Sequence, residues 1–436
     1  MCDTFVALGD STADGSVVFG KNSDREPNEA HEVTMVSAGE HPDGSRVRCT
    51  HISVPQVRRT HRVLLAKPYW IWGAEMGVNE RGVVIGNEAL FNRGTREDSP
   101  GLIGMDLLRL GLERADTAAE AVAVISELLQ RHGQSGQAGH THDFQYDNSF
   151  IAADRTEAWI LETMGRDWVA RRVTDRASIS NGLTTRTTWD LASVGISDGT
   201  DVARQFAEPV YTRFADATGR QCRTTDALDE RRGSLTVADA MDLLRHHDST
   251  DAAWSPSRAL IGQDVCMHAG FGPVRSSQTT GSLVARLGDD GVTVWVTGAS
   301  APCTATFTPV WVDVDPPDFG PRPRGYFDPD TKWWRHELLH RATLRDYPHR
   351  IRVYGADRDA LQEDLLNTVP AANAPAAERA AFSSVALERV ERAESEWLNA
   401  VSRTPVDVPL TDRLRTAPYR RAWDSFDRQA RMPEEN

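Results

Sequence analysis

The first 25 residues read MCDTFVALGDSTADGSVVFGKNSDR and contain two predicted strands. Thr4–Leu8 and Ser16–Lys21 are apolar or β-branched, and the Gly-, Asp- and Ser-rich segment between them is typical of a turn. Cys2 follows the initiator Met directly. If Met1 is removed, Cys2 carries a thiol and a free α-amine, which titrate at about 8.5 and about 7.7–8.0. The stretch therefore predicts a nucleophile and its base on one residue, held by a strand.

The overall composition excludes several classes of protein. The 436 residues include 49 Lys and Arg against 63 Asp and Glu, which gives a formal net charge of −14. This acidic balance argues against a nucleic-acid partner and against an anionic membrane surface. Because no long apolar run and no signal-peptide pattern occur, we expect a soluble, cytoplasmic protein. Five cysteines without a Cys-x-x-Cys pair favour free thiols over a disulfide framework.

Residues 1 to about 185 alternate predicted strands with loops and contain two predicted helices. One helix covers Leu107–Arg114, and a second begins at the capping box that Thr117 opens. Gly133–Gly139 is rich in Gly and Gln and is expected to be an exposed loop. Three further strands are predicted at Phe150–Ala153, Ala158–Thr163 and Trp168–Val173.

The second half of the chain is predicted to contain more helix. Residues of about 186–260 are polar and mostly helical, and form an insertion in a catalytic domain that covers residues 1–312. Strands return at Ser282–Leu287 and Val292–Thr297. A Pro-rich connector follows at 313–330, and residues 331–436 form a helical extension packed on the catalytic domain, with helices at Lys332–Asp346 and Ala376–Ala400.

Eight further segments are informative as a set, in this order along the chain: 19–25, 72–89 (WGAEMGVNERGVVIGNEA), 148–150, 159–163, 179–181, 266–270 (CMHAG), 276–282 (SSQTTGS) and 333–337 (WWRHE). With residues 2–7, they resemble the secernin-like dipeptidases, a branch of the N-terminal-nucleophile (Ntn) hydrolases. The resemblance implies an α+β fold, a four-layer α/β/β/α sandwich with two mainly antiparallel sheets. It also implies a cysteine-type dipeptidase that forms an acyl-enzyme on Cys2 after removal of Met1. A small peptide or amide would be the substrate, no cofactor is expected, and a homo-oligomer is compatible with it.

The resemblance assigns roles to individual positions. Cys2, Asp24, Asn87 and Asn181 are the expected catalytic residues, and Lys21, Glu88 and Arg275 are expected to bind substrate. Asp24 ends the second strand, where related acylases place an acid that holds the amine and the thiol. Those acylases have Arg where this chain has Lys21, which keeps the charge but loses the bidentate fork. For Lys21, a surface salt bridge is the competing interpretation.

Other polar positions also have competing interpretations. Asn87 and Asn181 each follow a predicted strand, at Val83–Gly86 and Ala177–Ser180 respectively. The resemblance implies that they contact the oxyanion, the thiol or the substrate. The competing interpretation is that each is a turn Asn that caps its own backbone, which is common. Glu75 and Glu88 could bind a substrate ammonium group or make a structural hydrogen bond. His142 and His268 are interpreted as lone structural histidines.

One rival motif is His336-Glu337-Leu338-Leu339-His340, which fits H-E-x-x-H. On a helix this pattern places two His on one face to bind zinc, with the Glu as general base. No Gly-containing extension follows, and a third ligand at His349 or Glu363 has no pattern support. Packing is the favoured interpretation, and a zinc metallopeptidase is a less favoured hypothesis. An N-acyl amide hydrolase and a non-peptidase secernin-like protein with a modified N-terminal Cys are also compatible with the sequence.

Overall fold

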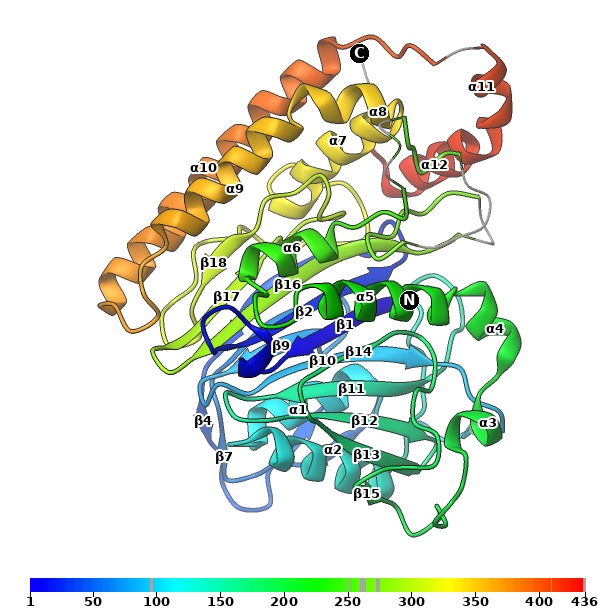
Figure 1. Cartoon of the computed structure of the whole chain (residues 1–436), viewed down its shortest axis with the longest axis vertical. Coiled ribbons are helices and arrows are strands. Elements are labelled where there is room, and N and C mark those ends of the chain that lie inside the picture. The colour runs from blue at the N-terminus through cyan, green and yellow to red at the C-terminus, as the bar shows by residue number, and fades with distance from the viewer. Residues whose placement is uncertain are drawn as a thin grey trace.

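Two antiparallel sheets lie face to face in the computed structural model, which describes residues 1–94, 97–249, 251, 253–258, 264–271, 275–408 and 410–433 (Figure 1). The six-stranded sheet has the order β14-β1-β2-β16-β17-β18. Its strands are β1 (Cys2–Ala7), β2 (Val17–Arg25), β14 (Arg176–Ile179), β16 (Gln278–Gly288), β17 (Gly291–Val296) and β18 (Thr308–Val310).

The eight-stranded sheet has the order β15-β13-β12-β11-β10-β9-β8-β3. Its strands are β3 (His31–Val36), β8 (Val63–Pro68), β9 (Met76–Asn79), β10 (Val84–Leu90), β11 (Asp147–Ala153), β12 (Ala158–Met164), β13 (Asp167–Val173) and β15 (Leu191–Ala192). Two small ribbons flank it, β4 (Gly39–Glu40) with β7 (Arg59–Thr60) and β5 (Arg46–Arg48) with β6 (Ser53–Pro55).

Helices cover the outer face of each sheet. On the eight-stranded sheet lie α1 (Gly104–Arg114) and α2 (Ala118–His132), packed through Leu108 and Ile125. Over the six-stranded sheet, the contacts with Phe5 and Val18 come from α5 (Ala217–Glu230), α6 (Val237–Leu244), α9 (Gly355–Thr368) and α10 (Ala376–Arg403). The layers therefore follow the order α/β/β/α, and the predicted fold class is confirmed.

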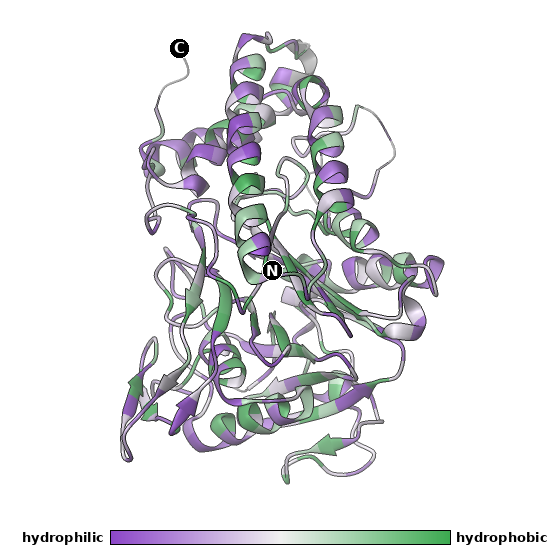
Figure 2. Cartoon of the chain, turned by 90° about the vertical axis from the view of Figure 1, so that its left-hand side faces the viewer, coloured by the Kyte–Doolittle hydropathy of each residue, from purple (hydrophilic) through white to green (hydrophobic). Residues whose placement is uncertain are grey.

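The remaining helices extend these layers. Two short ones, α3 (Val202–Phe206) and α4 (Pro209–Phe214), precede α5, and two 3₁₀ turns span Gly9–Ser11 and Ile351–Val353. The C-terminal part also has α7 (Lys332–Leu344), α8 (Tyr347–Arg350), α11 (Leu410–Arg415) and α12 (Ala417–Ala430). Figure 2 shows green and purple residues alternating along the long helices, as expected for helices with one buried face. The division at residues 312 and 330 stays a prediction.

Strand β1 is buried on both faces. Because its side chains point alternately to the two faces, neighbouring residues pack against different layers. Val6 packs between the sheets against residues such as Ile151, whereas Phe5 faces the helical layer. Cys2 and Thr4 share the side of Val6, and Asp3 shares the side of Phe5. Cys2 pairs with Ser23 of β2, so the thiol lies at the end of the sheet, next to Asp24.

Two expectations about local structure are wrong. Gly133–Gly139 is not an exposed loop: Gln134, Ser135 and Ala138 are buried, because Gln134 hydrogen-bonds to Asn148 and Thr163. Asn87 does not follow a strand but lies inside β10, which continues to Leu90. No helix in the described part of the chain is both long and apolar enough to cross a bilayer.

Candidate active site

The Cys2 thiol lies where the two sheets meet at one end, and the side chain is only 4% exposed. Its Sγ accepts a hydrogen bond from the Asp24 backbone N–H at 3.3 Å and lies 3.9 Å from Glu75 Oε2. Burial raises the pKa of Cys2 to about 12, although the positive charge of Lys21 opposes this shift. The thiol is therefore protonated in this state and needs a base before it can attack a carbonyl.

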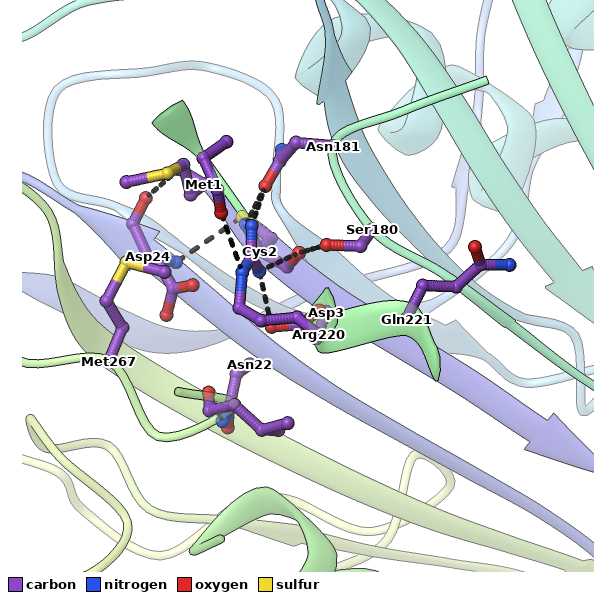
Figure 3. Close-up of polar contacts among 12 residues, drawn as sticks. Met1, Cys2, Asp3, Asn22, Asp24, Ser180, Asn181, Arg220, Gln221 and Met267 are labelled. Carbon is purple, nitrogen blue, oxygen red and sulfur yellow. Dashed lines mark hydrogen bonds and ion pairs between the residues drawn. The ribbon is translucent and has the colours of Figure 1, made fainter. Parts of the chain in front are cut away.

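The backbone nitrogen of Cys2 is held by a buried polar network (Figure 3). It donates to Asn181 Oδ1 at 3.0 Å. The same oxygen accepts from Arg220 Nη2 at 2.6 Å, and Arg220 Nη1 donates to the Cys2 carbonyl at 3.0 Å and to Asp3 Oδ2 at 2.5 Å. Asn181 Nδ2 donates to Ala89 O at 2.9 Å. Asn181, two residues after β14, and Arg220 of helix α5 thus both hold the backbone of Cys2.

Asp24 lies beside the thiol and next to the last position of β2. Its Oδ1 accepts from Thr279 Oγ1 at 2.6 Å, while its buried Oδ2 has no hydrogen-bond partner among the described residues. Burial raises the pKa of Asp24 to about 7. Met1 continues the pairing of β1, because its N donates to Asp24 O and its O accepts from Asp24 N, both at 2.9 Å.

Lys21 and Glu88 form a fully buried ion pair behind the thiol. Lys21 Nζ lies 3.3 Å from Glu88 Oε1 and donates to the Asn87 carbonyl at 2.5 Å. Burial opposes the charge of Lys21, but Cys2 and Glu88 raise its pKa. Burial also raises the pKa of Glu88 to about 8, and Thr4 Oγ1 donates to that carboxylate. Neither side chain lines the cavity described below.

Gly86 of β10 makes room for this pair, because it has no side chain. A Cβ at Gly86 would lie 2.6 Å from Lys21 Cδ and 2.9 Å from the Phe19 ring. The side chain of Asn87, next in β10, contacts the amide of Asn148 at 2.9 Å, and in its alternative amide orientation it donates to Glu75 O at 2.9 Å. Its predicted oxyanion role stays a prediction.

A cavity of about 520 Å³ opens over the thiol. Carboxylates, one Arg and aromatic rings line it together with Met1 and Cys2. The acidic lining residues are Asp24, Glu26, Glu29, Glu75 and Asp143. The aromatic lining residues are Phe91, Phe144, Tyr146, Tyr211 and Phe214. The site can therefore receive a ligand that carries both a positive charge and an apolar group.

Arg25, the last residue of β2, organises the acidic wall of the cavity. Its Nη2 donates to Glu29 Oε1 at 2.7 Å and to Ala138 O at 2.6 Å. Its Nη1 donates to Tyr146 Oη at 2.8 Å and lies 3.2 Å from Glu75 Oε1. This ion pair orients Glu75 so that its other oxygen faces the sulfur of Cys2.

Some predicted site residues lie elsewhere. Arg275 is buried and donates to Pro256 O at 2.8 Å and His268 O at 2.7 Å, so it braces a loop outside the cavity lining. Gly272 and Pro273 of its flanking loop lie outside the described residues. His142 reaches the cavity rim and pairs with Glu26 at 3.0 Å.

The H-E-x-x-H residues are buried in α7. Glu337 binds Arg341 at 2.6 Å and His340 Nδ1 at 3.1 Å, and His336 Nδ1 pairs with Glu394 at 2.9 Å. These ion pairs and hydrogen bonds account for the motif residues as buried packing residues of α7. Across the described residues, they belong to no group of three or more side chains arranged to hold a metal ion.

Arg220 and Arg25 are the residues that sequence reasoning missed. Arg220 lies in a polar helix with weak periodicity, so nothing local distinguishes it from a solvated Arg. Arg25 is the last residue of segment 19–25 and directly follows Asp24. This position beside an expected catalytic residue could have indicated that Arg25 belongs to the site. The sequence offers the same two interpretations for Glu75 and Glu88, a contact with a substrate ammonium group or a structural hydrogen bond. Of the two, only Glu75 lines the cavity.

A family model and a curated protein each match part of the chain. Residues 1–190 match the model of peptidase family C69. A dipeptidase of Bifidobacterium longum is 27% identical over 204 residues, which is 41% of this chain and 36% of that protein. The chain thus spans about a third of the length of this curated relative.

Two solved structures show weaker similarity. A C2A mutant of conjugated bile acid hydrolase from Clostridium perfringens aligns with a TM-score of 0.43 at 12% identity, over 71% of this chain and 92% of that one. Penicillin V acylase from Agrobacterium tumefaciens aligns with a TM-score of 0.40 at 13% identity, over 71% and 86%. The match to the family model covers residues 1–190, which include Cys2, Lys21, Asp24 and Glu75. A segment of slightly less than half of this chain is thus similar to peptidase family C69.

Proposed function

We propose that the protein is a cysteine dipeptidase that hydrolyses short peptides with a free amino group, through an acyl-enzyme on Cys2. One observation carries the proposal: the Cys2 sulfur borders a cavity of about 520 Å³, with its own nitrogen held by Asn181 and a carboxylate 3.9 Å away. The name of the Bifidobacterium relative, a dipeptidase, supports the same class of reaction.

The mechanism requires removal of Met1, because an amide nitrogen is not a base. Loss of Met1 turns the Cys2 nitrogen into an amine, for which Asn181 Oδ1 at 3.0 Å is already an acceptor. It also frees the backbone groups of Asp24 that Met1 now occupies, and it enlarges the cavity that Met1 lines. Asp24, whose backbone N–H contacts the Cys2 sulfur at 3.3 Å, would then stabilise the protonated amine through its carboxylate.

The reaction then follows from these groups. The α-amine takes the thiol proton, and the thiolate attacks the carbonyl carbon of the substrate. The amine returns that proton to the leaving nitrogen, the C–N bond breaks, and a thioester remains on Cys2. Water, deprotonated by the same amine, attacks the thioester, and the proton passes to the departing sulfur. Lys21, held by Glu88, stabilises the negative charge that forms near the sulfur.

The substrate class follows from where Glu75 lies. In a dipeptide, the amino group and the scissile carbonyl carbon are bonded to the same Cα. A carboxylate that binds this amino group must therefore lie within a few Å of the nucleophile. Glu75 Oε2 meets this condition at 3.9 Å from Cys2 Sγ, and Arg25 fixes its orientation. The aromatic wall would take an apolar side chain of the peptide.

The experiment is a comparison of paired substrates. A dipeptide and its N-acetylated form are assayed with wild-type protein, Cys2→Ala and Glu75→Gln. We expect hydrolysis of the free dipeptide only, no turnover by Cys2→Ala, and a rise in KM for Glu75→Gln by more than tenfold, since a charged hydrogen bond contributes about 1.5–3 kcal/mol. Preferential cleavage of the acetylated form would instead identify an N-acyl amide hydrolase. Turnover by Cys2→Ala would refute the mechanism.

A further inference from the structure

Four side chains from distant parts of the sequence meet in a buried cluster next to the active site. They are His247, which follows α6, Cys266 and His268, which precede β16, and Cys303, which follows β17. One ligand atom from each lies within 4.8 Å of all the others. We propose that these residues bind a structural Zn²⁺ ion. His268 is buried, as expected for a structural histidine, but it is not isolated, because its Nε2 contacts His247, Cys266 and Cys303.

The distances from His268 Nε2 to the other three ligand atoms fit a tetrahedral ion. Zn–S bonds of about 2.3 Å and Zn–N bonds of about 2.0–2.1 Å place ligand atoms about 3.3–3.8 Å apart. His247 Nε2 lies 3.1 Å from His268 Nε2. The Nε2 of His268 lies 3.7 Å from Cys266 Sγ and 3.4 Å from Cys303 Sγ. These three of the six ligand–ligand distances agree with the expected spacing within a few tenths of an ångström, and the other three are no longer than 4.8 Å.

The type and number of ligands indicate zinc and a structural role. Two thiolates and two imidazoles in a tetrahedral arrangement suit Zn²⁺, whereas Mg²⁺ and Ca²⁺ prefer oxygen ligands. Four protein ligands leave no open position for water or substrate, as in sites that stabilise a fold. The two acidic residues nearest in the sequence have other partners. Asp264 Oδ1 accepts from the backbone N–H of Asp248 at 2.8 Å, and the Asp248 carboxylate pairs with Arg223 at 3.3 Å.

The surroundings of the cluster are aromatic, and three of its four side chains are buried. The ring of His247 stacks on Trp254, with centroids 3.8 Å apart and planes 17° apart. Tyr347 of α8 packs edge-on against both rings, and Cys266 and Cys303 belong to an apolar cluster that includes Trp423 of α12. The packing fixes the imidazole of His247 and excludes water from the thiolates, as a permanent metal site requires.

The site would couple the C-terminal helices to the nucleophile. Met267 stands between the two ligands Cys266 and His268, and Figure 3 shows it beside Asp24. Met267 N donates to Thr279 Oγ1 at 2.9 Å, and this hydroxyl donates to Asp24 Oδ1 at 2.6 Å. A bound ion would therefore hold the loop that positions Asp24, without contacting the substrate.

The test measures metal content and then geometry. Untagged protein, produced with Zn²⁺ in the medium, is passed through a chelator-containing buffer and analysed by mass spectrometry for metals. We expect about one zinc ion per chain in the wild type, and loss of it in Cys266→Ser/Cys303→Ser. Cys222→Ser removes an exposed thiol outside the cluster and is the matched control, which should retain the ion.

A second readout covers the case in which the double variant fails to fold. Co²⁺ replaces Zn²⁺ in the wild type, and its absorption spectrum should show tetrahedral coordination and a thiolate charge-transfer band. His247→Gln, at a half-buried position, should weaken that spectrum while the chain stays folded. Folded wild type that takes up neither ion, equal zinc in the wild type and the double variant, or a Cys266–Cys303 disulfide in place of the ion would each overturn the proposal.

Discussion

Substitution of Arg220 by Met tests the network that fixes the N-terminal residue. The Arg220 side chain is fully buried and contacts Asp3, the Cys2 carbonyl and Asn181 at 2.5, 3.0 and 2.6 Å. Methionine fills similar space but leaves the Asp3 carboxylate buried without its partner. Breaking such a pair costs about 3–5 kcal/mol. At about 2 °C per kcal/mol for a long chain, Tm should fall by roughly 6–10 °C.

The assay is thermal unfolding with matched variants. Arg223→Met, on the same helix, removes partly exposed ion pairs with Asp216 and Asp248, and should lower the stability by no more than about 1 kcal/mol. Asp3→Asn combined with Arg220→Met should recover part of the loss, because the uncompensated charge is gone. If Arg220→Met melts within a degree of the wild type, the buried network does not stabilise the fold as we argue.

Three other predictions follow from the same geometry. Burial raises the pKa of Asp24 to about 7, so the folded chain keeps a proton that the unfolded chain releases. The stability contributed by this group therefore falls as the pH rises from about 4 to 7. Asp24→Asn should flatten that part of the Tm–pH curve. Gly86→Ala should cost about 1–3 kcal/mol in chemical denaturation, because its Cβ would overlap Lys21, whereas Gly355→Ala, with its nearest atom at 3.8 Å, should not destabilise the chain. Glu337→Gln should lower Tm, because the ion pair with Arg341 is lost, while peptide hydrolysis continues. Loss of all activity with an unchanged Tm would instead favour the H-E-x-x-H zinc mechanism.

Local patterns predicted most of the elements around the site. The turn between β1 and β2 and the capping position Thr117 are local signals, and the Thr117 side chain accepts from the Glu120 backbone N–H as expected. The four-layer arrangement came from the resemblance to a known family. It depends on which faces are buried together, and periodicity does not specify that.

Long-range polar contacts could not be predicted. Arg220 lies 218 positions from the Cys2 carbonyl that it binds, and Gln134 is buried because Asn148 and Thr163 satisfy its amide. The same holds for the proposed zinc ligands, which span residues 247–303 without a recognisable spacing. In each case a polar residue is buried because its partners come from other elements.

Quenched-flow mass spectrometry of the intact protein during turnover of a slow dipeptide ester tests the mechanism most directly. We predict a chain that lacks Met1 and carries an added aminoacyl group, mapped by peptide sequencing to the sulfur of Cys2. Active protein that retains Met1, or an acyl group found on any other residue, would contradict the proposed role of Cys2.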